Sequence, residues 1–413
     1  MTNNGMLCNM KKTINNTYVY IFSFLLVLTC VSSSAATSNR GVIIPFIKFD
    51  TVYCFLFIII LGIVNVLLHK KIKFDIICVL FLLRIILCLI PVFYIDMPSS
   101  FFGNFVESCF PFCIYLFYLN SRGNVKKITD MFLVFAIIIS AQCVLAYIII
   151  VVRGCASYSA PYYKDYFVIP IGATNNISAD LLPILIIGDQ VIDSKKKKCF
   201  FNLFVCLAIF LTKSRTGLLL VLLYFFIRFF LKSKQHYNLI KRFILIFLSF
   251  LLVALLFMSE DSFFIKLLMG YAQGKNITLD RLFSGRFQLI GEFIPFIWRH
   301  LFFGNGICYE FVDSKLRRTH NVFIQVLYEN GIVGGICLCL FIVLVVLIIR
   351  RTSSNKYYYA FGVASVFVVL NSLVEEVFFG YFNQVLCLYY IASMQLYLFE
   401  KNQYKTSRIS RLL

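Results

Sequence analysis

Apolar stretches follow one another along almost the whole chain and are separated by short polar connections. Most are long enough to cross the ~30 Å hydrocarbon layer of a bilayer as α-helices of roughly 20 residues. The pattern predicts an all-α, polytopic membrane protein with about 12 transmembrane helices, and residues 1–413 are expected to form a single integral membrane domain. The stretches run approximately over residues 18–36, 51–68, 74–95, 100–119, 128–152, 171–192, 199–212, 216–231, 243–258, 322–349, 357–374 and 377–398.

The composition excludes a water-soluble protein. Of the 413 residues, 61% are hydrophobic and only 14% are charged, with a mean hydropathy of +0.87, which globular soluble chains do not reach. The formal net charge is +20. Because the basic residues lie in short clusters between apolar stretches, they indicate membrane topology and not a nucleic-acid partner.

Basic residues concentrate in every second connection, and more than half of the 39 Lys and Arg residues lie there. By the positive-inside rule, these connections and both termini are predicted to be cytoplasmic. Residues 11–38 also resemble a signal peptide, but an uncleaved start-transfer helix is expected. The basic segments contain Lys11 and Lys12; Lys70, Lys71 and Lys73; Arg122, Lys126 and Lys127; Lys195 to Lys198; Lys232, Lys234, Lys241 and Arg242; Arg350, Arg351 and Lys356; and Lys401, Lys405, Arg408 and Arg411.

Residues 259–321 form one large loop on the predicted outer side, with room for folded structure outside the membrane. Within it, Ser284 is predicted to cap a helix that continues through Trp298. Apolar residues cover much of the circumference of this helix, so it is expected to lie at the membrane surface. The run Gly304-Asn305-Gly306 then predicts a turn.

A polar stripe is predicted where this loop enters the tenth stretch. Asn321 is expected to cap the helix, and Gln325 and Glu329 follow at intervals of four, so they share one helix face. These groups either satisfy polar atoms of neighbouring helices or line a cavity, and the cost of an intramembrane carboxylate favours the cavity. Farther along, Gly331 and Gly335 are interpreted as small residues that allow close helix packing.

The connection around Arg215 is predicted to lie below the outer membrane surface. Only residues 199–212 separate Lys198 from Lys213, which gives about 21 Å of helix against roughly 30 Å of hydrocarbon. A cation held at such an apex needs water or an anion in a protein-lined pocket. The alternative is that Lys213 and Arg215 extend outward from an ordinary hairpin tip.

Arg84 lies midway along the third stretch and needs a partner inside the membrane. Two interpretations remain open. In the first, Glu107, Asp180 or Glu375 neutralises Arg84 structurally; in the second, Arg84 binds an anionic ligand.

One motif resembles a known family. His320-Asn321, nine further residues and Gly331-Ile332-Val333-Gly334 resemble the His-[Asn/Ser/Gln]-x9-Gly-x-x-Gly pattern of the O-antigen ligase and O-antigen polymerase superfamily. The resemblance covers roughly residues 199–340. Three further features resemble the family in the same order: Ser214-Arg215-Thr216-Gly217, Ser284-Gly285-Arg286 and Gly304-Asn305-Gly306.

The resemblance implies a fold similar to multi-spanning (GT-C-like) glycosyltransferases and a reaction at the periplasmic face of the bacterial inner membrane. The donor would be an undecaprenyl-pyrophosphate-linked oligosaccharide, and no metal or other cofactor is implied. His320 would accept or orient the proton of the acceptor hydroxyl, and Arg215 and Arg286 would bind the pyrophosphate. Besides the lipid bilayer, a chain-length regulator and a flippase are expected partners. Further candidates for the substrate cavity are Arg84, Arg318, Asn321, Gln325 and Glu329.

Three functions remain open. In a polymerase the acceptor is another lipid-linked repeat unit, and in a ligase it is the lipid A core. The polymerase is favoured because Gly335-Ile336 stands where ligases often carry small hydroxyl residues. A flippase or transporter predicts paired inverted repeats, which the sequence does not show.

Overall fold

The computed structural model describes residues 20–21, 60, 64, 72–95, 101–121, 124–153, 166–232, 286–307, 319–374 and 381–409. The predicted span 243–258 and almost all of 18–36 and 51–68 lie outside these residues, as do the candidate helix cap Ser284 and the candidate site residue Arg318. The described residues therefore include nine of the predicted spans and parts of the outer loop.

The described chain is mainly helical, and a helix coincides with each of these nine predicted spans. The small antiparallel hairpin of β1 (Val168–Ile169) and β2 (Gly172–Ala173) departs from the all-α prediction. The helices are α3 (Ile76–Leu89) with its 3-10 extension η2 (Ile90–Phe93), α4 (Phe101–Asn120), α5 (Val125–Val152), α7 (Thr174–Val191), α8 (Lys195–Leu211), α9 (Arg215–Lys232), α13 (Arg286–Arg299), α14 (Val322–Thr352), α15 (Lys356–Ser372) and α16 (Tyr381–Ile409).

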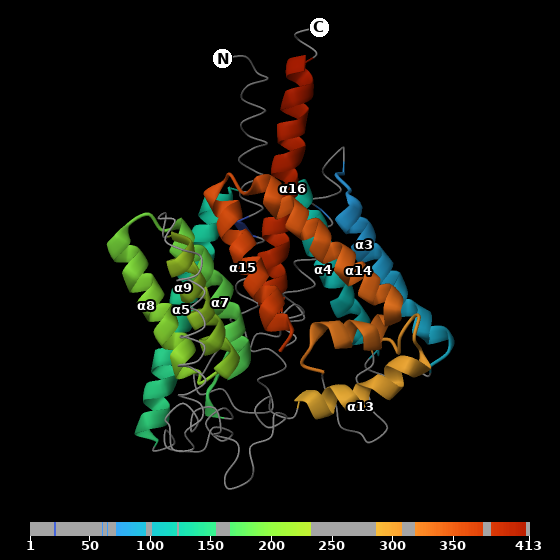
Figure 1. The fold of residues 1–413 in the computed structure, drawn as a ribbon, viewed down its shortest axis with the longest axis horizontal. Coiled ribbons are helices and arrows are strands. Elements are labelled where there is room, and N and C mark those ends of the chain that lie inside the picture. Colours follow the sequence, from blue (N-terminus) through green and yellow to red (C-terminus); the bar gives the residue numbers. More distant parts are fainter. Residues whose placement is uncertain are drawn as a thin grey trace.

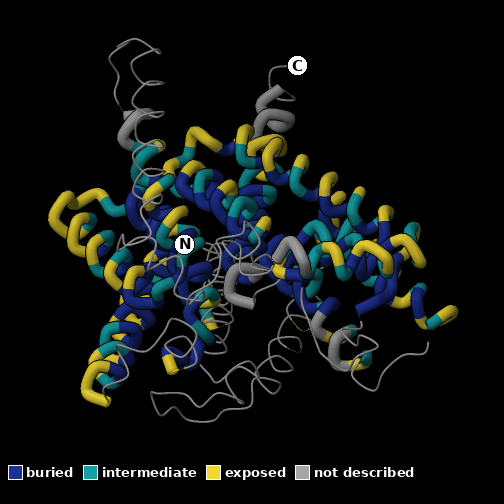
Figure 2. Tube along the Cα trace, turned by 60° about the horizontal axis from the view of Figure 1, so that its bottom comes forward, coloured by how far each residue is buried: buried dark blue, intermediate teal, exposed yellow. Residues whose placement is uncertain are grey.

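Several helices have the length and apolar surface that a bilayer requires. Within the described residues, Ile76–Phe93, Val125–Val152 and Val322–Thr352 are long and apolar enough to cross a membrane. The outward face of α8 exposes Phe200, Leu203, Leu207 and Phe210, a helical stripe of the kind that contacts lipid. Figure 2 shows that buried residues lie on the inward faces and exposed residues on the outward faces. These observations support a helical membrane protein, and the total of about 12 spans stays a prediction.

Helix α7 lies at the centre of one half of the molecule. It packs against α5, α8, α9 and α15, and Figure 1 shows it between α15 and the group of α5, α8 and α9. The ammonium group of Lys356, which begins α15, lies 2.9 Å from a carboxylate oxygen of Asp193, just after α7. The two helices are therefore antiparallel. Because each rises ~1.5 Å per residue, the end of α15 at Leu373 is level with the first two turns of α7.

Helix α14 is broken at Gly331, whose φ of 62° and ψ of −162° are not helical. In Figure 1 the opening turns of α14 lie across the direction of its long second part, so the predicted span is not one continuous helix. The predicted surface helix is present as α13, which also lies across the bundle (Figure 1). It packs on Tyr328 through Phe293 and Ile297, while Trp298 is 67% exposed.

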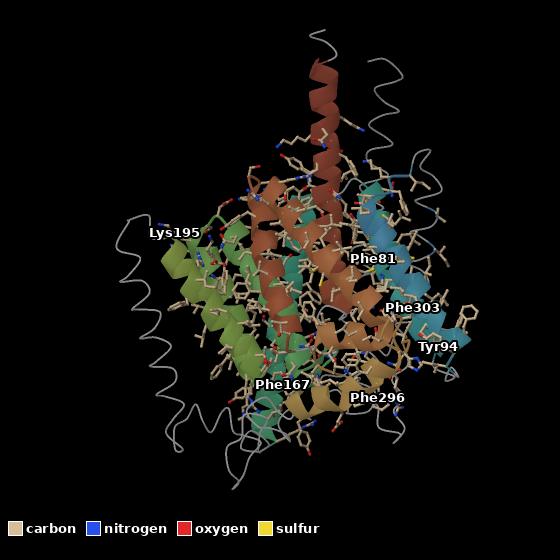
Figure 3. The ribbon with its side chains drawn as sticks, turned by 45° about the vertical axis from the view of Figure 1, so that its right-hand side comes forward. Phe81, Tyr94, Phe167, Lys195, Phe296 and Phe303 are labelled. Atoms are coloured by element: carbon tan, nitrogen blue, oxygen red, sulfur yellow. The ribbon has the colours of Figure 1, made fainter. Side chains whose placement is uncertain are left out.

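The helical bundle has two distinguishable ends. Figure 3 shows Lys195 at one end, and Tyr94, Phe167 and Phe296 at the opposite end. We call these the lysine end and the loop end. The basic connection before α8 and the loop after α13 therefore lie at opposite ends, as the predicted alternation requires. Which end faces the cytoplasm stays a prediction.

Candidate functional site

The loop after α13 supplies hydrogen-bond partners to the backbone groups that α14 leaves unpaired at its break. At a break, the helix loses backbone hydrogen bonds on both sides of the interrupted residue, and buried backbone groups need replacements. Residues 301–306 and 328–333 supply them to each other, and we call this unit the backbone clasp. Its bonds run from Asn305 N to Tyr328 O (2.7 Å), from Gly306 N to Glu329 O (2.9 Å), from Ile332 N to Leu301 O (2.9 Å) and from Val333 N to Phe302 O (3.3 Å).

Two glycines make the clasp possible. Gly331 has a positive φ of 62°, and a Cβ there would lie 2.3 Å from the carbonyl oxygen of Phe302. Gly304 has a φ of 77°, and its Cβ would lie 2.4 Å from the carbonyl carbon of Glu329. Only glycine combines this backbone conformation with such a close approach. The side chain of Asn305 adds a bond from Nδ2 to the carbonyl oxygen of Phe296 at 3.1 Å.

His320 is held in an unusual backbone conformation directly before α14. Its φ is 53°, in the left-handed region, and its side chain is exposed. The residues on both sides are anchored: Thr319 Oγ1 donates to the carbonyl oxygen of Asn321 at 2.8 Å, and Asn321 Nδ2 donates to the carbonyl oxygen of Leu373 at 3.0 Å. A left-handed residue with a side chain costs about 1–2 kcal/mol, and such positions gather at functional sites.

The predicted cap and polar stripe are both present. Asn321 Oδ1 accepts from the backbone N–H groups of Phe323 at 2.9 Å and Ile324 at 3.2 Å, so Asn321 is the N-cap of α14. Gln325 Nε2 donates to Glu329 Oε1 at 2.7 Å, and the two residues are 2% and 3% exposed. Gln325 Oε1 also accepts from the backbone of Thr319 at 3.4 Å. The stripe therefore connects the loop that carries His320 to the break at Gly331.

Arg84 lies on α3, which packs against α14. The charges of Arg84 and Glu329 both act on Cys88, and Asn330 Nδ2 donates to the sulfur of Cys88 at 3.5 Å. The structure thus places Arg84 and Glu329 near the same cysteine, an arrangement that the sequence does not suggest. Of the partners considered from the sequence, Asp180 lies on α7, whereas Glu375 and the side chain of Glu107 lie outside the described residues.

The turn between α8 and α9 is fixed against α7. Thr212 and Ser214 are buried, and Ser178 Oγ donates to Ser214 Oγ at 2.9 Å. Ser214 also caps α9, because its hydroxyl accepts from the N–H of Gly217 at 3.4 Å. A Cβ on Gly217 would lie 2.7 Å from the Cβ of Ser178, so the approach needs glycine. Arg215 is therefore the first residue of a firmly held helix.

Arg215 and His320 lie at the same end of the bundle, the loop end. Ser178, which holds the turn at Ser214, lies in the first two turns of α7. Leu373, which holds Asn321, is level with those turns because α7 and α15 are antiparallel. Arg286 begins α13, but its side chain lies outside the described residues, as does the whole of Arg318.

A supporting contact that the sequence does not indicate joins α3 to the clasp. The hydroxyl of Tyr94, at the end of η2, donates to the carbonyl oxygen of Gly304 at 2.6 Å. The Tyr94 ring also stacks on His300, with ring centroids 5.0 Å apart. Nothing in the local sequence marks Tyr94, because Gly304 lies 210 residues away along the chain.

Part of the chain is similar to a known protein family. Residues 200–339 match a family model described as O-Antigen ligase. The matched segment begins in α8 and ends in α14, so it contains the Ser214 turn, α13, the backbone clasp and His320. No curated protein shows significant similarity to the chain. The segment that contains His320, the Ser214 turn and the backbone clasp is therefore similar to the O-antigen ligase family.

Proposed function

We propose that the protein is an O-antigen (surface polysaccharide) polymerase of the bacterial inner membrane. It would join undecaprenyl-pyrophosphate-linked repeat units at the periplasmic face. The bond from the donor's anomeric carbon to the pyrophosphate oxygen breaks, and the acceptor hydroxyl oxygen bonds to that carbon. The hydroxyl proton passes to His320, and the lipid pyrophosphate leaves. A chain-length regulator and a flippase are the proposed protein partners.

The observation that carries this proposal is the way His320 is held. A sugar hydroxyl is a weak nucleophile, so a base must be positioned within hydrogen-bond reach of it. His320 combines an exposed side chain with a strained backbone between two anchored residues, Thr319 and Asn321. Such an arrangement favours a pre-positioned base, because groups held on rigid supports need less reorganisation during the reaction.

The leaving pyrophosphate needs cationic partners. We assign this role to Arg215, at the start of α9, and to Arg286, at the start of α13. A guanidinium fork binds phosphate oxygens in a fixed geometry and stabilises negative charge as it develops. The other residues that we propose for the substrate cavity are Arg84, Arg318, Asn321, Gln325 and Glu329. Within the described structure, Asn321 and Gln325 also hold the loop that carries His320.

A ligase is the second candidate, because the matched family model is described as O-Antigen ligase. The lipopolysaccharide of a deletion strain separates the two functions. A single repeat unit on the lipid A core is the expected result and indicates a polymerase. Absence of any repeat on the core, with lipid-linked polymer accumulating, would instead show a ligase.

The sidedness of the site is tested separately. We propose that both termini and the lysine end are cytoplasmic and that the loop end is periplasmic. Reporter fusions after Lys197 should behave as cytoplasmic, and fusions after Ser284 should behave as periplasmic. The reverse result at either point would place the site on the wrong face for this reaction.

A further inference from the structure

Lysines from the first turns of three helices converge at the lysine end. Lys356, at the start of α15, places its Nζ 2.9 Å from both carboxylate oxygens of Asp193. The charges of Lys198 from α8 and Lys126 from α5 act on the same carboxylate. The sequence separates these lysines into three connections. The packing of α5 on α8, and of both α8 and α15 on α7, brings them together.

The lysines outnumber the carboxylates that face them. Asp130 on α5 is the second acidic group here, since Asp130 and Asp193 both act on Tyr357. Except for the partly exposed Lys198, these groups are solvent-exposed, and Lys195 to Lys197 stand beside Lys198 in the first turn of α8. We call the group of Lys126, Lys127, Lys195 to Lys198 and Lys356 the lysine patch. It keeps a strong local excess of positive charge.

Helix polarity adds to this excess. The N-terminal end of a helix carries a partial positive charge, so cations are disfavoured there and anions are favoured. All lysines of the patch lie in the first turns of α5, α8 and α15. By contrast, the exposed residues Arg350 and Arg351 lie in the last turn of α14, where the helix polarity favours cations. The lysines of the patch therefore lie at helix N-termini, where the helix dipole disfavours positive charge.

The surface next to the patch is apolar. Phe200, Leu203 and Leu207 follow the lysines along α8, and all three are exposed. Their spacing of three and four residues puts them on one helix face, and Lys196 of the patch begins that same face. A ligand that fits both features has an anionic head beside the lysines and an apolar chain along α8. A free phosphate ion would use only the first feature.

We propose that the lysine patch and the exposed stripe of α8 form a binding surface for anionic phospholipid, with its phosphate beside the lysines and an acyl chain along Phe200 and Leu203. This inference is independent of the proposed polymerase activity. Hydrogen bonding to Lys356 lowers the pKa of Asp193, so this carboxylate is ionised at neutral pH. Asp193 therefore competes with the lipid phosphate for the lysines.

The test measures lipid retention by the purified full-length protein in neutral detergent. Native mass spectrometry compares bound phosphatidylglycerol with phosphatidylcholine of the same acyl chains. Each lysine near an anionic lipid contributes on the order of a fivefold change in affinity. The double variant K196Q/K198Q, which removes one lysine on the face of the apolar stripe and one that faces Asp193, should therefore retain about 25-fold less phosphatidylglycerol. The variant D193N should retain several-fold more, because it removes the competing carboxylate and releases Lys356.

The matched control is R350Q/R351Q, which also removes two cations and should change phosphatidylglycerol retention little. Equal losses in the two double variants would show diffuse surface attraction and overturn the proposal. Unchanged or lower retention in D193N would overturn it as well. Inorganic phosphate or an acidic peptide that displaces the lipid at equal concentration would point to a free-anion or protein site instead. Glycosyl transfer is not measured, so these outcomes do not depend on the polymerase assignment.

Discussion

The backbone N–H of Asn305 donates to the carbonyl oxygen of Tyr328 at 2.7 Å, just before the break in α14. This bond shows that two separate sequence motifs form one structural unit. Gly304-Asn305-Gly306 supplies the loop of the clasp, and Gly331 supplies the break that receives it. The nine residues between Asn321 and Gly331 form the short transverse helix, about two and a half turns at 3.6 residues each. The spacing of the family motif therefore sets the distance between His320 and the clasp.

Gly331→Ala should destabilise the protein strongly. The change forces alanine into a positive-φ, extended-ψ conformation that is almost confined to glycine, at about 1–3 kcal/mol, and places its Cβ against the carbonyl oxygen of Phe302. The melting temperature in detergent should fall. The matched control is Gly291→Ala on α13, where a Cβ meets nothing within 4 Å. The control should gain about 0.5–1 kcal/mol, as alanine does inside helices. Equal melting temperatures for both variants would show that the clasp does not support the fold.

The two functions of Asn321 can be separated by substitution. Asn321→Asp keeps the acceptor that caps α14 but loses the donor to Leu373, whereas Asn321→Ala loses both. Asn321→Ala should cost about 1 kcal/mol of stability from the cap alone. Both variants should lower the rate of glycan elongation, because the loop that carries His320 is no longer held to α15.

The control for these variants is Asn355→Ala. Asn355 caps α15 at the lysine end, where its side chain accepts from Tyr357 N at 2.9 Å. The Asn355→Ala variant should lose about as much stability as Asn321→Ala and should keep the parent elongation rate. If Asn321→Asp also keeps the parent rate, the bond to Leu373 does not position His320.

Local chemistry in the sequence predicts those features that depend on near neighbours. The apolar stretches, the amphipathic helix that ends near Trp298, the Asn321 cap and the Gln325–Glu329 stripe all follow from spacing within a few turns. The break at Gly331 does not, because Gly331 and Gly335 also fit a close-packed helix pair. The backbone at the break is satisfied by residues 301–306, whose N–H groups donate to residues 328 and 329 and whose carbonyl groups accept from residues 332 and 333. Distant pairs such as Tyr94 with Gly304 are equally hidden from the local sequence.

A buried polar network should make α7, α8 and α9 one rigid unit. The carboxylate of Asp189 accepts from Tyr224 and Asn202 at 2.6 Å each and pairs with Arg228. Removing one member of a buried ion pair leaves the other uncompensated, which typically costs about 3–5 kcal/mol. Asp189→Asn should therefore lower the melting temperature markedly, and Asp189→Asn combined with Arg228→Met should recover part of the loss.

The control for this network is Asp193→Asn, which breaks a solvent-exposed ion pair with Lys356. Exposed pairs contribute little to stability, so the melting temperature should remain close to that of the parent. An equal effect of Asp189→Asn and Asp193→Asn would contradict the structural importance of the Asp189 network.

Arg215→Lys tests the pyrophosphate assignment. A lysine keeps the charge but not the planar fork of donors, so most activity should be lost while the protein still inserts. Arg215→Ala should lose about 10²- to 10³-fold in rate, as expected when one group that stabilises the developing charge is removed. Arg299→Lys is the matched control, because Arg299 is exposed on α13 and contacts the ring of Phe296. Full activity of Arg215→Lys would show that Arg215 only reaches toward solvent.

His320→Ala is the decisive test of the proposed mechanism. Loss of a general base typically costs 10²- to 10⁴-fold, so polymer should disappear while the protein remains at normal levels in the membrane. Stability should fall by no more than about 1 kcal/mol, because the side chain is exposed and alanine and histidine both have a Cβ in this left-handed conformation. His300→Ala is the control. It removes the ring stacked on Tyr94, so it should lower the melting temperature slightly and leave the elongation rate near that of the parent. If purified His320→Ala protein still elongates lipid-linked repeat units at the parent rate, then His320 supports only the turn before α14, and another group must accept the hydroxyl proton.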